Sequence, residues 1–149
     1  HTLFIASNQL QTLFDQHIPE LSLKQFILLS TIRQAREPLT ITQTGALLGC
    51  SRQNVKKIAK TLEQKGFLQI RPGHTDLRVS CLCVTEQGED FFKTTFSVYQ
   101  EELAYLFEAY TAKEMETLFR LLMKLYDGID HLAKAVDGKP VQKKEKAHE

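Results

Sequence analysis

The stretch from Thr40 to Gly66 constrains the fold of this chain more than any other. It reads TITQTGALLGCSRQNVKKIAKTLEQKG and indicates two helices joined by a tight turn. We expect Thr42 to cap the first helix, because its hydroxyl can accept a free backbone N–H of the first turn. Residues 46–48 give this helix an apolar side, and Gly49 interrupts the pattern. Ser51 is the cap position of the second helix.

The second helix of this pair separates an apolar face from a polar one. Val55, Ile58, Ala59 and Leu62 recur at helical spacing and predict a buried face. Gly66 ends the helix, because glycine adopts the left-handed conformation without a Cβ penalty. The other faces are polar or basic, and they carry Arg52, Gln53, Asn54, Lys56, Lys57, Lys60 and Thr61.

These polar side chains match the chemistry of duplex DNA. Arg, Gln and Asn can make paired hydrogen bonds to guanine or adenine edges in a major groove. The lysines further along the helix suit phosphates, which a point charge neutralises without fixed geometry. An apolar face inward and a base-reading face outward is the layout of a helix-turn-helix recognition helix. The alternative is an ordinary amphipathic surface helix with solvated lysines.

Charge is concentrated in the same region. The formal net charge of the chain is only +1, yet residues 51–78 contain seven Lys or Arg against two acids, Glu63 and Asp76. A basic segment on an otherwise acidic body is expected for local contact with a polyanion.

After the second helix, the sequence period changes from helical to alternating. Residues 67–71 and 79–84 are β-prone, and residues 72–76 between them are typical of a turn. The pattern predicts a β-hairpin directly after the recognition helix, which is a wing. His74 and Thr75 at its tip are placed to meet a DNA backbone.

Helices are predicted on both sides of this region. One ends before Pro19, and the next runs from Leu23 to about Arg36 behind a capping box of Ser22 and Gln25. Its buried positions are expected at Phe26, Ile27, Leu29, Ser30 and Ile32. A long helix is predicted over about 86–110, and a last helix over about 112–135 behind a capping box of Thr111 and Glu114.

The last helix has a wide apolar stripe, and the first helix is also rich in Leu and Phe. A winged core is compact, so it offers these helices little apolar surface to pack on. Their apolar stripes therefore predict a dimer interface. A monomeric helical cap is the alternative. We expect residues 1–135 to form a single unit and residues 136–149 to be a polar, disordered tail.

The remaining composition narrows the class of protein. Three cysteines without an export signal indicate a reducing, cytoplasmic location, and no stretch is long enough for a membrane span. Cys81 and Cys83 share one strand face as small apolar packers, whereas Cys50 lies in the turn, where oxidation would disturb the basic helix. The histidines are scattered, and no catalytic motif is present. We therefore expect no metal, no cofactor and no enzyme activity.

Several short motifs resemble the MarR family of bacterial winged helix-turn-helix regulators. They are Leu23-x-x-Phe26, LLGCSRQNV at 47–55, LExKGFL at 62–68, DxR at 76–78 and VTExG at 84–88, in that order. The flanking helices agree in pattern only. One departure is Thr44-Gly45, where the family usually has Glu-Leu, and a helix glycine costs about 1 kcal/mol in propensity.

The resemblance implies a mainly α fold with a small β-hairpin wing (α+β). It implies a DNA-binding lobe at about 38–88 and dimerisation helices at 1–20 and 110–135. A homodimer would place its recognition helices on a pseudo-palindromic double-stranded DNA operator. Arg78 would enter the flanking minor groove, with Asp76 steadying it. The full set of expected DNA contacts is Ser51, Arg52, Gln53, Asn54, Lys56, Lys57, Lys60, His74, Thr75 and Arg78.

The resemblance also implies a repressor that a small aromatic or amphipathic effector releases from DNA. By position, Phe14, His17, Phe26 and Arg33 are the candidate effector contacts, although aromatic side chains at helical spacing more often belong to the core. Two alternatives stay open: a winged-helix protein-interaction module without specific DNA binding, and a cysteine-based redox-responsive regulator.

Overall fold

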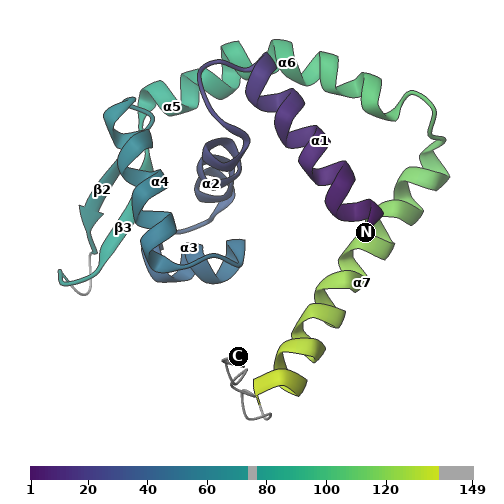
Figure 1. Ribbon diagram of the computed structural model, residues 1–149. Coiled ribbons are helices and arrows are strands. Elements are labelled where there is room, and N and C mark those ends of the chain that lie inside the picture. Colours follow the sequence, from purple (N-terminus) through teal and green to yellow (C-terminus); the bar gives the residue numbers. More distant parts are fainter. Residues whose placement is uncertain (74–76, 138–149) are drawn as a thin grey trace, which may run out of the picture. The chain divides into compact units, whose positions relative to one another are not determined.

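The computed structural model describes residues 1–73 and 77–137. Most of the described chain is helical and one small antiparallel sheet is present, so the predicted mainly α fold with a β-hairpin is confirmed (Figure 1). The chain divides into two compact units, residues 1–102 and 103–149. In the part of the chain that the structure describes, no helix has the length and apolar character that a membrane crossing requires.

The first unit opens with α1 (Thr2–His17) and α2 (Leu23–Gln34). The predicted capping box is present: the Ser22 hydroxyl accepts the Gln25 N–H, and the Gln25 side chain accepts the Ser22 N–H. The helix ends before the predicted Arg36. Its buried positions include Leu28, whereas Ile27 is 43% exposed, so the prediction for Ile27 was wrong. Leu29 and Ile32 are buried as predicted, and Phe26 and Ser30 are half-buried.

The helix-turn-helix consists of α3 (Ile41–Leu48) and α4 (Arg52–Gln64). The cap of α3 is Thr40 and not Thr42, because α3 begins two residues earlier than the sequence pattern indicated. The Thr40 hydroxyl accepts the Gln43 N–H at 3.2 Å, and the Gln43 side chain accepts the Thr40 N–H at 2.9 Å. Of the expected apolar side at 46–48, only Leu48 packs against the core; residue 46 and Leu47 are exposed.

The buried side of α3 instead contains Ile41, Thr44 and Gly45. A Cβ at Gly45 would lie 2.8 Å from the Cys50 carbonyl oxygen, and the Cys50 N–H donates to the Gly45 carbonyl at 2.9 Å. The Thr44 hydroxyl donates to the Thr40 carbonyl at 2.9 Å, so its burial leaves no hydroxyl unpaired. The Thr44-Gly45 pair therefore has a structural reason: it lets the start of α4 pack closely against α3.

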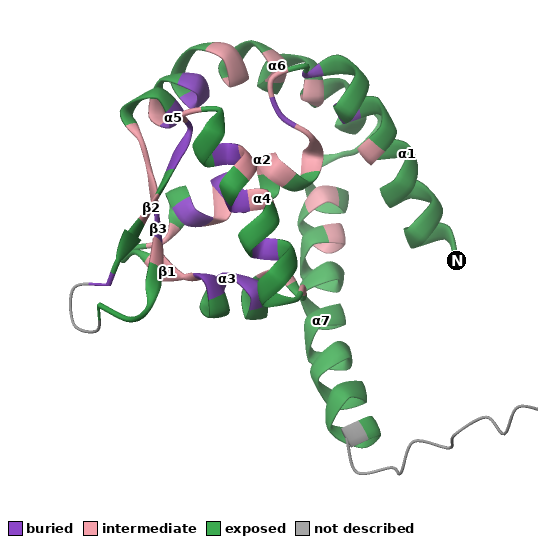
Figure 2. Ribbon diagram, turned by 60° about the vertical axis from the view of Figure 1, so that its left-hand side comes forward, coloured by how far each residue is buried: buried purple, intermediate pink, exposed green. Residues whose placement is uncertain are grey.

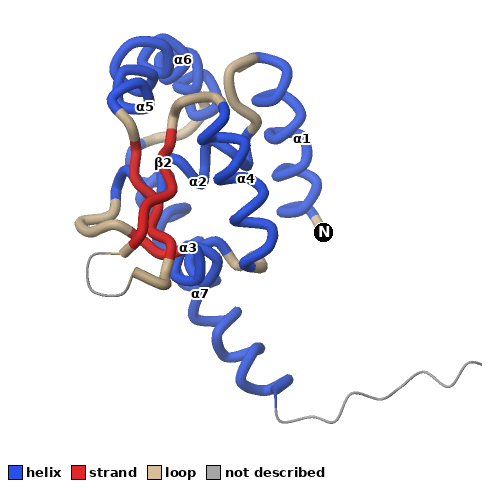
Figure 3. The backbone as a smooth tube through the Cα atoms, turned by 90° about the vertical axis from the view of Figure 1, so that its left-hand side faces the viewer, coloured by secondary structure: helices blue, strands red, loops and turns tan. Residues whose placement is uncertain are grey.

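The sheet has three antiparallel strands in the order β1-β3-β2, formed by β1 (Leu39–Thr40), β2 (Leu68–Pro72) and β3 (Ser80–Val84) (Figure 3). The predicted hairpin of β2 and β3 is confirmed. The short β1 carries too few residues to show an alternating pattern, and the sequence did not predict it. Leu82 on β3 is fully buried, so Cys81 and Cys83 share the opposite face, as expected.

The core of this unit lies between α2, α4 and the sheet (Figure 2). From α4 it takes Val55, Ala59 and Leu62, all fully buried, and this confirms the predicted inner face. An aromatic cluster extends the core towards the segment after β3. Its members are Phe14, Phe26, Phe67, Phe91, Phe92 and Phe96, with neighbouring ring centroids 4.5–6.4 Å apart.

The long helix predicted at 86–110 is present from Glu86 to Phe107, but it is not a regular α-helix throughout. The segment consists of α5 (Glu86–Asp90), a π-helical turn η1 (Phe91–Thr95), α6 (Phe96–Leu103) and a 3-10 turn η2 (Ala104–Phe107). A π-helical turn inserts an extra residue into the helical period. Phe91 and Phe92 in this turn are both buried. In a regular helix two adjacent side chains point in different directions, so one buried face accommodates both less readily.

The second unit contains α7 (Ala112–Asp137). The predicted capping box is confirmed, since the Thr111 N–H donates to the Glu114 carboxylate at 2.8 Å and the Thr111 hydroxyl accepts the Glu114 N–H. The hydrogen bonds that the Thr111 N–H and hydroxyl donate to this carboxylate lower the pKa of Glu114. Large apolar side chains are exposed along much of the helix: Phe119, Leu121, Leu122, Met123, Leu125, Tyr126, Ile129, Leu132 and Val136.

Gly45→Ala tests the close contact between α3 and α4. We expect the free energy of unfolding to fall by about 1–3 kcal/mol, because the added methyl group meets a backbone oxygen that can move little. Gly128→Ala in α7 is the control: nothing lies within 4 Å of its added Cβ. Alanine should there raise helix stability by about 0.5–1 kcal/mol. Urea unfolding followed by circular dichroism measures both variants, and an unchanged midpoint for Gly45→Ala would contradict this account.

Candidate nucleic-acid interface

The candidate interface begins at the turn before α4. The Ser51 hydroxyl accepts the Asn54 N–H at 3.2 Å, so Ser51 is the predicted N-cap. Gly49 before it has a φ of 63°, a left-handed conformation that glycine adopts without strain. The turn therefore fixes where α4 starts and which way its first residues point.

The outward face of α4 is polar and exposed to solvent. Its side chains oppose the buried Val55, Ala59 and Leu62, and all of them are exposed: Arg52, Gln53, Asn54, Lys56, Lys57 and Lys60. Among the described residues, the salt bridges are formed by His17 with Glu102 and by Arg33 with Glu89, so no cation of α4 is neutralised in this way. The structure thus brings together six of the expected DNA contacts on one helix face.

Two charged residues at the far end of α4 have internal roles that the sequence did not reveal. Lys65 Nζ donates to the Glu20 carbonyl at 2.8 Å and to Gln25 Oε1 at 3.0 Å. Glu63 Oε1 accepts the Ile70 N–H of β2 at 2.9 Å. These contacts fasten the end of α4 to the α1–α2 loop, to α2 and to the wing. Their only sequence signal was membership of the LExKGFL motif.

The wing carries the other expected DNA contacts. The Gly73 N–H donates to the Val79 carbonyl at 2.9 Å and joins the two sides of the hairpin. Arg78 is exposed just before β3. His74, Thr75 and Asp76 lie outside the described residues, so their expected roles remain predictions.

Three of the four candidate effector residues are engaged in internal contacts. Phe14 is buried, and its ring centroid lies 5.2 Å from that of Phe26. The Arg33 guanidinium lies 4.6 Å from the centroid of Phe92, and its Nε donates to Glu89 Oε2 at 3.0 Å. The aromatic residues thus occupy the core, which was the alternative given for them, and Arg33 closes over it.

The fourth candidate, His17, belongs to a polar cluster between the end of α1 and α6. Its Nε2 is hydrogen-bonded to the Glu102 carboxylate, and its ring meets Tyr99 edge-on at 5.4 Å. Burial raises the pKa of the Tyr99 phenol, and the nearby carboxylates of Glu20 and Glu102 raise it further. The cluster ties α1 to α6 and leaves His17 itself exposed.

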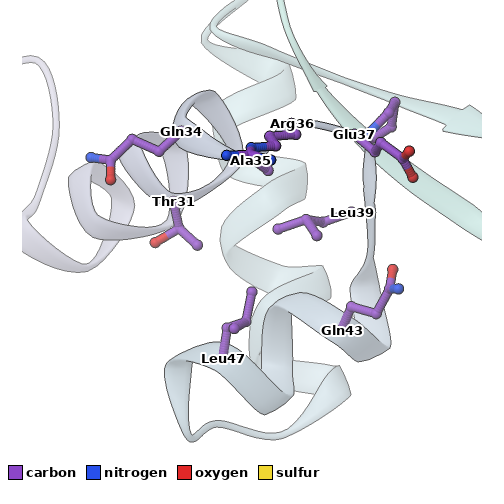
Figure 4. Close-up of a pocket in the computed structure, with 9 residues that line it drawn as sticks. Thr31, Gln34, Ala35, Arg36, Glu37, Leu39, Gln43 and Leu47 are labelled. Atoms are coloured by element: carbon purple, nitrogen blue, oxygen red, sulfur yellow. The ribbon is translucent and has the colours of Figure 1, made fainter.

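An open groove of about 580 Å³ lies at the other end of α2, between that helix, β1 and α3 (Figure 4). It is lined by Thr31, Gln34, Ala35, Arg36, Glu37, Pro38, Leu39, Gln43 and Leu47. None of the four candidate effector residues lines this groove. The exposed Leu47, which belongs to the apolar side expected for the first helix of the pair, lies at its α3 side.

Comparison with known proteins agrees with the resemblance seen in the sequence. The model of the MarR family matches residues 21–80. Over 108 residues the chain is 28% identical to the transcriptional repressor MprA of Escherichia coli K12, which covers 72% of this chain and 61% of MprA. The chain thus spans less than two thirds of the length of that curated relative.

Solved structures share the fold. A complex of Staphylococcus aureus MepR with DNA has a TM-score of 0.74 at 18% identity, covering 86% of this chain and 95% of MepR. Bordetella bronchiseptica BpsR has a TM-score of 0.72 at 19% identity, covering 85% and 91%; its structure concerns regulation of its DNA binding by 6-hydroxynicotinic acid. The fold is a MarR-type winged helix, and the resemblance to the MarR family is confirmed, with residues 21–80 as the segment that matches the family model.

Proposed function

We propose that this chain is a transcriptional regulator that binds double-stranded DNA with sequence preference. The observation that carries the proposal is the outward face of α4, which presents Arg52, Gln53 and Asn54 beside three lysines without ion-pair partners among the described residues. Arg, Gln and Asn read base edges in a major groove, and lysines neutralise phosphates. The DNA complex of the similar protein MepR supports this assignment.

The proposed assembly is a homodimer on a pseudo-palindromic operator. Its support is the apolar surface that α1 and α7 each leave exposed, including Phe4 at 74%, Phe119 at 67% and Leu132 at 65%. Exposed apolar surface of this extent marks a contact surface on a protein. Two copies related by a twofold axis would present two α4 helices to half-sites one helical turn apart.

The proposed mode of action is repression that a small aromatic or amphipathic effector relieves. MprA is a transcriptional repressor, and DNA binding by BpsR is regulated by 6-hydroxynicotinic acid. In this chain Phe14 packs against Phe26, and Arg33 lies over Phe92 of the same aromatic cluster. An effector would therefore have to reach the exposed His17 or open the cluster.

The test of the function is selection from random double-stranded DNA at about 0.15 M salt, followed by sequencing. An enriched inverted repeat with half-sites about ten base pairs apart supports the dimeric regulator. Weak, strongly salt-dependent binding without enrichment leaves only the electrostatic part of the interaction. That outcome would favour a winged-helix protein-interaction module.

Three substitutions distinguish the base contacts expected of α4 from its expected phosphate contacts. Arg52→Ala and Asn54→Ala should each cost about 1–3 kcal/mol on the selected site and relax base preference, because they remove base contacts. Lys60→Ala should weaken binding to all sequences and lower the salt slope by about one unit, because it removes a phosphate contact. Fluorescence anisotropy over a salt series measures both effects. Unchanged affinity in all three variants would eliminate α4 as the recognition helix.

Ser51 allows capping to be separated from DNA contact. Ser51→Ala should lower the free energy of unfolding by about 1 kcal/mol, because α4 loses its N-cap. Ser51→Asp should preserve that stability, since aspartate caps as well as serine and suits the helix dipole. It should nevertheless lower DNA affinity more than Ser51→Ala does, because it places a negative charge beside the phosphates. Equal DNA affinity of the Asp variant and the unaltered chain would place Ser51 away from DNA.

Arg78→Ala tests the wing. We expect the largest loss of affinity on operators with A·T-rich flanks, whose narrow minor grooves concentrate negative potential around an inserted arginine. The comparison uses two duplexes with the same half-sites and either A·T-rich or G·C-rich flanks. An equal loss on both duplexes would argue for simple phosphate contact instead.

A further inference from the structure

Two thiols lie together on the outer face of the wing sheet. Cys81 and Cys83 flank Leu82 on β3, and Leu82 is fully buried. Because successive side chains of a strand alternate, both cysteines occupy the face opposite the core. Both are free and half-buried, so a small ion can reach them from solvent.

The positively charged Arg71 lies on the same face of the sheet as the two thiols. The strand register places Arg71 opposite Cys81 and Gln69 opposite Cys83, and residues directly opposite share a face. Arg71 Nε donates to Gln69 Oε1 at 2.9 Å, and its Nη2 donates to the same oxygen. The guanidinium is therefore held towards Gln69 on β2, on the face of the sheet that carries both cysteines.

The spacing suits a bridging ion better than a disulfide. Alternate residues of a strand are about 6.6–6.8 Å apart, whereas a disulfide needs Cβ atoms about 3.5–4.5 Å apart. A metal held between two thiolates spans about 4.6 Å from sulfur to sulfur, given metal–sulfur bonds of about 2.3 Å. Rotation about χ1 can bring each sulfur inward to that separation.

The number of donors decides which kind of ion fits. Across residues 1–73 and 77–137, no group of three or more His, Cys, Asp or Glu side chains could complete a larger coordination shell. Soft thiolate ligands select Cu(I), which accepts two sulfurs in line. Two thiolates and one monovalent cation carry a net charge of −1, which the Arg71 guanidinium offsets.

We propose that Cys81 and Cys83 bind one soft monovalent cation of the Cu(I) type as a linear bis-thiolate on the wing sheet. Both thiols release their protons to solvent, two metal–sulfur bonds form, and no oxidation state changes. This site is separate from the α4 face and does not depend on the proposed DNA binding.

The test uses Ag(I) as a soft monovalent probe that stays in one oxidation state. Silver nitrate is titrated into the reduced full chain in buffer free of chloride and thiols, and binding is followed by calorimetry and native mass spectrometry. Cys81→Ser and Cys83→Ser should each lower the affinity by more than about 100-fold, since losing a ligand exceeds the loss caused by an outer-shell change. Cys50→Ser is the matched control and should bind like the unaltered chain.

Arg71 provides a test of the charge argument. Arg71→Gln should lower Ag(I) affinity by about tenfold, in the range of outer-shell partners, and Arg71→Lys should recover part of the loss. Circular dichroism verifies that each variant is folded. In the unaltered chain, one equivalent of Ag(I) should protect Cys81 and Cys83 together from alkylation while Cys50 still reacts, which tests the pair without any substitution.

Three outcomes would overturn the proposal. They are tight binding that survives Cys83→Ser, binding that requires Cys50, and protection of the three cysteines one at a time as silver is added. The last pattern would mean independent thiols with no shared ion.

Discussion

The burial of one face of α4 is the constraint on which the rest of the winged unit depends. Val55, Ala59 and Leu62 are fully removed from solvent, and complete burial of a Val or Leu side chain contributes about 1.5–3 kcal/mol. Because the same three residues fix the rotation of the helix about its axis, they also determine which residues face outward. Rotation by one residue would bury Lys56 or Lys60, and burying an unpaired charge is costly.

The two ends of α4 are fixed by different chemistry. At its start, Gly45 lets the Cys50 carbonyl approach α3, and Ser51 caps the helix. At its end, Lys65 and Glu63 hold α2 and β2 through hydrogen bonds. The helix is thus set in position by one tight backbone contact and by side chains that remain at the surface. The exposed polar residues at 52–54, 56, 57 and 60 between these anchors are left available for a partner.

Local patterns predicted much of this arrangement from the sequence, and long-range packing accounts for most of the errors. The capping boxes and the hairpin follow from residues close together in the chain, and these predictions were confirmed. The exposed Leu47 and the buried Thr44 depend on how α3 meets α4, which its own periodicity does not encode. The π-helical turn in the helix after β3 likewise arises because the aromatic cluster takes in both Phe91 and Phe92.

The candidate interface shows the same division between local and long-range information. Residue types and spacing identified the polar face of α4, but they could not separate binding cations from structural ones. Seven Lys or Arg lie between residues 51 and 78, yet Lys65 is held by the Glu20 carbonyl and by Gln25, and Arg71 donates to Gln69. Both cations keep their charge, but these hydrogen bonds hold their side chains against the protein. The charge carried by α4 itself is that of Arg52, Lys56, Lys57 and Lys60, which are gathered on one helix.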